Sequence, residues 1–89
     1  NHKEWKKDLD RKLKGVEKEL KEKEAVIEKS NQAIETLNAL FVNDPASVTR
    51  LKMEELASAQ SDLERAEERW LTLLEQRETL TKELNKALD

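Results

Sequence analysis

The sequence predicts an all-α fold, an antiparallel two-helix coiled-coil hairpin, from three observations. Apolar residues recur in alternating steps of three and four on both sides of the chain's middle, the spacing of helices that bury a seam against another helix. The only proline, Pro45, lies between the two runs, where it ends one helix and begins the next. The composition is 42% charged and 3% aromatic, which suits a thin helical seam better than a globular core.

The first helix is expected from about residue 3 to residue 41. Gly15 falls inside it on the solvent side, where it weakens the helix by about 1 kcal/mol relative to alanine without breaking it. Its seam positions are Leu9, Leu13, Val16, Leu20, Lys23, Ile27, Ser30, Ile34, Leu37 and Phe41.

The turn is expected at about residues 42–47. Asp44 suits the N-cap of the second helix, because its carboxylate accepts hydrogen bonds from unpaired N–H groups. Pro45 then occupies the first helical position, where a missing N–H costs nothing. Ser47 is an alternative cap, so the second helix is placed at about residues 48–87.

The second helix carries the matching half of the seam. Folding the hairpin so that Leu37 faces Leu56 makes each later pair of facing residue numbers sum to 93, and all 89 residues then form one domain. Its seam positions are Leu56, Ala59, Leu63, Ala66, Trp70, Leu73, Arg77, Leu80, Leu84 and Ala87. In this register Leu20 faces Leu73, Lys23 faces Trp70, and Arg77 packs its methylenes on Val16.

The sequence contains little that could carry chemistry. It has no cysteine, one histidine (His2) and one glycine, so thiolate metal sites and glycine-rich phosphate loops are excluded. A two-helix rod has no pocket to raise the pKa of a carboxylate. We therefore expect no catalytic residue, no metal and no cofactor within these residues. No apolar run approaches the ~18 residues that a membrane span requires.

The charge is unevenly distributed along the chain. Residues 1–23 carry nine basic and six acidic side chains, whereas the whole chain has a net charge of −3. A local basic excess is typical of polyanion contacts, although the interleaved acids reduce it. The expected contact set for nucleic acid is Lys6, Lys7, Arg11, Lys14, Lys18 and Lys21.

The second helix contains the triplet Glu68-Arg69-Trp70, which follows a leucine-heptad hairpin with a short Asp/Pro turn. In these features residues 3–75 resemble the C-terminal coiled-coil domain of Uup-type ABC-F ATPases. The family often has Glu after the Trp, where this chain has Leu71, and the chain continues past the usual family end. The resemblance implies a cytoplasmic parent ATPase with two ATP-binding cassettes, and a tail that contacts nucleic acid or the ribosome in translation. Because the chain begins with Asn1, it is expected to be part of a longer protein.

Two other interpretations remain open from the sequence. The C-terminal arm of valyl-tRNA synthetases is a similar hairpin that binds tRNA, but its turn usually has Ala-Pro before a Val-Val pair, unlike residues 44–48 here. The other is a structural coiled coil whose partner is a protein, with Trp70 either in the seam or an exposed anchor. The turn favours a monomer, whereas a second apolar stripe leaves a dimer open. That stripe comprises Val26, Ala33, Leu40, Leu74 and Leu88.

Overall fold

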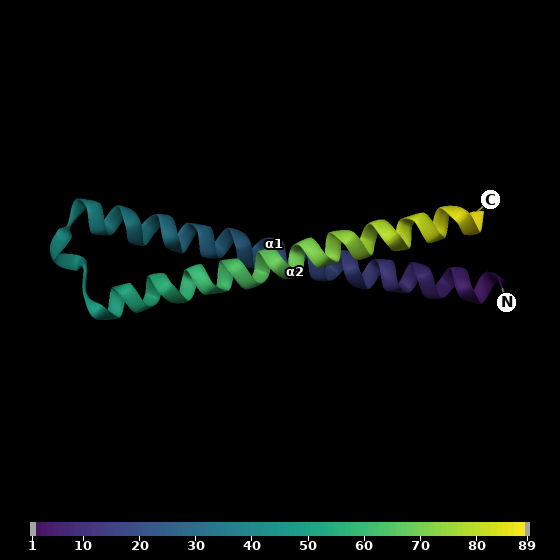
Figure 1. Ribbon diagram of the computed structural model, residues 1–89, viewed down its shortest axis with the longest axis horizontal. Helices are drawn as coiled ribbons and strands as arrows, with labels where there is room; N and C mark the ends of the chain where they lie inside the picture. Colours follow the sequence, from purple (N-terminus) through teal and green to yellow (C-terminus); the bar gives the residue numbers. More distant parts are fainter. Residues whose placement is uncertain (1, 89) are drawn as a thin grey trace.

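The chain forms two long antiparallel helices joined by one tight turn (Figure 1). The computed structural model describes residues 2–88, and the side chains of residues 3–87. Helix α1 spans His2–Asn43, a 3-10 turn η1 spans Pro45–Ser47, and helix α2 spans Arg50–Leu88. The hairpin measures 66 × 17 × 14 Å. The predicted fold class, an all-α antiparallel hairpin, is confirmed.

The seam between the helices follows the predicted heptad positions. Every predicted seam residue of α1 is buried or half-buried, and the most buried, Leu20, is 3% exposed. On α2, Leu73 is 1% exposed and Ala66 is 3% exposed. Because each layer of the rod holds only one residue from each helix, many seam residues stay half-buried rather than fully enclosed.

Arg77 departs from the predicted seam. It is exposed, whereas Leu74, one turn earlier, is half-buried. A guanidinium group keeps its hydration when its side chain turns toward water, so burial of Arg77 against Val16 would cost free energy. An open hollow of about 720 Å³ lies beside Val16 on this side of the seam, and Gln76 is among the residues that line it.

The turn differs in detail from the prediction. Helix α1 continues to Asn43 and α2 begins at Arg50, so each helix end lies one or two residues from its predicted position. Asp44 makes no side-chain capping hydrogen bond and precedes the separate 3-10 turn that begins at Pro45. The cap of α2 is Thr49, whose Oγ1 accepts a hydrogen bond from the Lys52 N–H at 3.2 Å.

Ser47 stabilises the end of α1 rather than the start of α2. Its hydroxyl donates to the Asp44 carbonyl oxygen at 2.6 Å and lies 3.3 Å from the Leu40 carbonyl oxygen. These carbonyls belong to the last turn of α1 and the residue after it, and each also accepts a backbone hydrogen bond, Leu40 from the Asp44 N–H and Asp44 from the Ser47 N–H. The reversal therefore needs a six-residue connection, residues 44–49, in which Pro45 starts η1 and Thr49 caps α2.

Candidate nucleic-acid interface

The predicted contact residues all lie on the exposed surface of α1. Because α1 is one continuous helix, their spacing fixes where they lie around its axis. Steps of four and three residues place five of them within an arc of about 80°. We call this group the basic strip: Lys7, Arg11, Lys14, Lys18 and Lys21.

The basic strip lies on the side of α1 opposite to the seam and extends for about 21 Å along the axis. The sixth predicted residue, Lys6, falls about 60° outside this arc, because it precedes the seam residue Leu13 by one heptad. It is exposed beside the open end of the hairpin. The structure therefore brings together five of the six predicted residues and separates Lys6.

Ion pairing distinguishes five basic residues of α2 from the residues of the basic strip. On α2, Arg50, Lys52, Arg65, Arg69 and Lys82 each lie within 3.3 Å of a carboxylate oxygen. None of the basic-strip residues takes part in an ion pair among the described residues, although acidic residues are interleaved with them in the sequence. Their charged groups are therefore available to a polyanion without breaking an existing contact.

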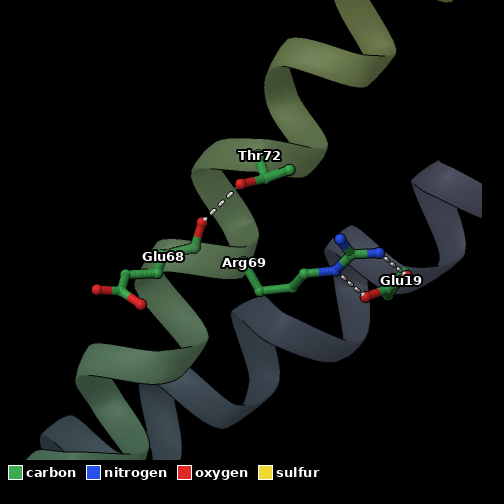
Figure 2. A network of polar contacts seen from close by, with 4 residues as sticks. All are labelled: Glu19, Glu68, Arg69 and Thr72. Carbon is green, nitrogen blue, oxygen red and sulfur yellow. Dashed lines mark hydrogen bonds and ion pairs between the residues drawn. The ribbon is translucent and has the colours of Figure 1, made fainter.

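The three residues of the Glu68-Arg69-Trp70 triplet point in different directions. Arg69 reaches across the seam and donates two hydrogen bonds to the Glu19 carboxylate, at 2.7 and 3.0 Å (Figure 2). The Glu68 side chain lies on the side of α2 away from α1, and its carbonyl oxygen accepts a hydrogen bond from the Thr72 hydroxyl at 3.2 Å. Glu68 and Arg69 therefore face different surroundings, although they are adjacent in the sequence.

The Arg69–Glu19 pair is the ion pair that joins the two helices among the described residues. The hydrogen bond from Arg69 is the main reason that the pKa of Glu19 is lowered, and the nearby charges of Arg69 and Lys23 lower it further while desolvation acts against them. The hydrogen bond to Glu19 likewise raises the pKa of Arg69. Arg77, which the predicted register placed against Val16, is exposed, and it is Arg69 that pairs with a carboxylate across the seam.

Trp70 lies half-buried in the seam. Its indole Nε1–H donates a hydrogen bond to the Glu24 carboxylate at 3.3 Å, and a shallow hollow beside the ring is lined by Ile27 and Glu67. The contacts of Arg69 and Trp70 place the middle of α2 opposite residues 19–24 of α1, the stretch that the predicted register assigned to it.

Neither a metal-binding cluster nor a membrane span is present among the residues that the structure describes. Its His, Asp and Glu side chains form no group of three or more that could hold a metal ion. Neither described helix has a stretch both long and apolar enough to cross a lipid bilayer. Comparisons with protein-family models, with curated proteins and with solved structures found no match to this chain.

Proposed function

We propose that this hairpin is a non-catalytic accessory domain that contacts nucleic acid through the basic strip. The observation that carries the proposal is the alignment of five exposed cations on one face of α1, none of them in an ion pair with another residue that the structure describes. A row of cations on a rigid rod suits the regularly spaced phosphates of a polyanion. No base-reading aromatic lies in the strip, so recognition of ribosomal RNA, tRNA or DNA rests on backbone charge.

The resemblance to Uup-type ABC-F ATPases supports the biological setting of this proposal. It assigns the hairpin to the C-terminal end of a cytoplasmic ATPase that acts on the ribosome or on other nucleic acid. The chemistry of such a protein belongs to its ATP-binding cassettes, and the hairpin supplies a rigid arm. A gene that encodes two such cassettes upstream of this hairpin is the expected context.

The test is a titration of the hairpin with duplex DNA and with single-stranded RNA, each at about 50 and about 200 mM salt. If all five cations engage phosphates of duplex DNA, affinity should fall about 500-fold between these two concentrations, because counterions are released. The variant Arg11→Glu/Lys18→Glu should abolish binding, since it reverses two charges in the strip.

The matched control is Arg77→Glu/Lys86→Glu, which also reverses one arginine and one lysine. Both control residues are exposed and lie outside the basic strip, on α2. Equal loss of binding in the two double variants would show that only net charge matters and would contradict the assigned strip. Absence of binding at about 50 mM salt would contradict the proposal itself.

A further inference from the structure

The outer face of α2 carries a row of carboxylates that the proposed nucleic-acid contact does not use. We call Glu64, Glu68, Glu75 and Glu78 the acidic strip. Their spacing places them within an arc of about 80° on the side of α2 away from the seam, and Figure 2 shows Glu68 on that side. Glu78 is in an exposed ion pair with Lys82 at 3.3 Å. The other three take part in none among the described residues.

An apolar element lies at the centre of the acidic strip. Leu71 is 56% exposed and occupies the position between Glu68 and Glu75 in the same row. Together with Leu63 it lines an open hollow of about 330 Å³, which Glu64 and Glu68 border. The face therefore offers an apolar contact surrounded by negative charge, which suits the alkyl stem and charged end of a lysine or arginine.

The acidic strip and the basic strip have the same spacing. The basic strip advances from Lys7 to Lys21 in steps of four, three, four and three residues, and the row from Glu64 through Leu71 to Glu78 advances in the same steps. Two helices with matching rows of opposite charge keep their charges aligned along the whole contact. In the reverse direction the steps of the row are three, four, three and four, so the match in spacing holds when the two helices run parallel.

We propose that the acidic strip of one copy docks the basic strip of a second copy of this chain, with Lys14 beside Leu71. The two strips face away from the seam on different helices, so a hairpin cannot pair its own strips. The contact between copies is heterologous and leaves one unused strip at each end. Assembly is therefore open-ended, and the mean mass increases with concentration rather than stopping at a dimer.

The experiment is sedimentation equilibrium of the whole hairpin at about 20 and about 200 mM salt, up to about 1 mM protein. Association should be at least about tenfold weaker at the higher salt, because the contact consists mainly of exposed charge pairs. Leu71→Ser should weaken it without a change in charge. A single monomeric species at about 20 mM salt and the highest protein concentration would overturn the proposal.

Charge reversal identifies the faces involved. Glu64→Lys/Glu75→Lys should abolish association, whereas the matched control Glu28→Lys/Glu35→Lys, on exposed positions of α1, should leave it intact. Mixing Glu64→Lys/Glu75→Lys with Lys7→Glu/Lys14→Glu should restore association, because each variant then offers a face complementary to the other. Failure of the mixture to associate, while both variants remain helical by circular dichroism, would overturn the assigned contact.

The same variants separate this proposal from the nucleic-acid contact. Glu64→Lys/Glu75→Lys keeps the basic strip, so it should bind nucleic acid while no longer associating with itself. A hairpin that associates as described but binds no nucleic acid would contradict the proposed function and leave the contact between copies standing.

Discussion

Leu73 and Leu51 are both leucines of α2, but the first is buried and the second is exposed to solvent. Leu73, in the middle of the seam, is 1% exposed, whereas Leu51, near the turn, is 65% exposed. The residues around Leu51 are similarly exposed, since Val42 is 79% and Val48 is 49% exposed. The comparison shows that an apolar residue in this rod is buried only where its heptad position faces the partner helix.

The largest expected effect comes from removing the buried member of this pair. Leu73→Ala should lower the free energy of unfolding by about 3 kcal/mol, because it opens a cavity in the most buried layer of the seam. Urea unfolding followed by circular dichroism measures this change. Leu51→Ala is the control and should change stability by less than about 0.5 kcal/mol. Equal losses in the two variants would show that Leu51 is covered in solution.

Trp70 tests an intermediate degree of burial. Trp70→Ala should cost about 2 kcal/mol, less than the 3–5 kcal/mol typical of a fully enclosed aromatic side chain, because the ring is half-buried. Trp70→Phe keeps most of the packing and removes the hydrogen bond to Glu24, so it should retain most of the stability. A negligible change in Trp70→Ala would instead identify the ring as an exposed anchor for a partner.

Gly15 lies beside the open hollow near Val16, and its replacement by alanine should stabilise the hairpin. A Cβ added there meets no atom within 4 Å, while alanine is about 1 kcal/mol better than glycine inside a helix. Gly15→Ala should therefore raise the midpoint of urea unfolding. A lower midpoint would indicate that another group fills the hollow in solution.

The smallest effect concerns the exposed ion pair between the helices. The folded-state pKa of Glu19 is lowered, chiefly by the hydrogen bond from Arg69. The pair therefore contributes stability above the unfolded-state pKa of about 4.3, and loses it as the pH falls through the lower folded-state value. Glu19→Gln should be less stable than the native chain at pH 7, and the difference should vanish well below pH 4. A constant difference across this range would exclude the linkage.

The sequence was sufficient for the fold because a coiled coil is encoded locally. The heptad spacing predicted the seam positions from Leu9 to Ala87, and the single proline predicted where the chain turns back between two long helices. Each seam residue needs only one facing layer, so no long-range topology had to be inferred. The basic strip was also accessible from the sequence in principle, since steps of three and four residues define one face of any helix.

Three features were decided only by tertiary structure. Asp44 and Ser47 were the expected caps of the second helix, but the path of the chain between two fixed helices made Thr49 the cap. The heptad pattern does not specify which arginine and which carboxylate pair across the seam, and the relative position of the helices selected Arg69 and Glu19. Arg77 occupied a seam position in the heptad, but the free energy of guanidinium hydration outweighed the packing available in a rod two helices wide.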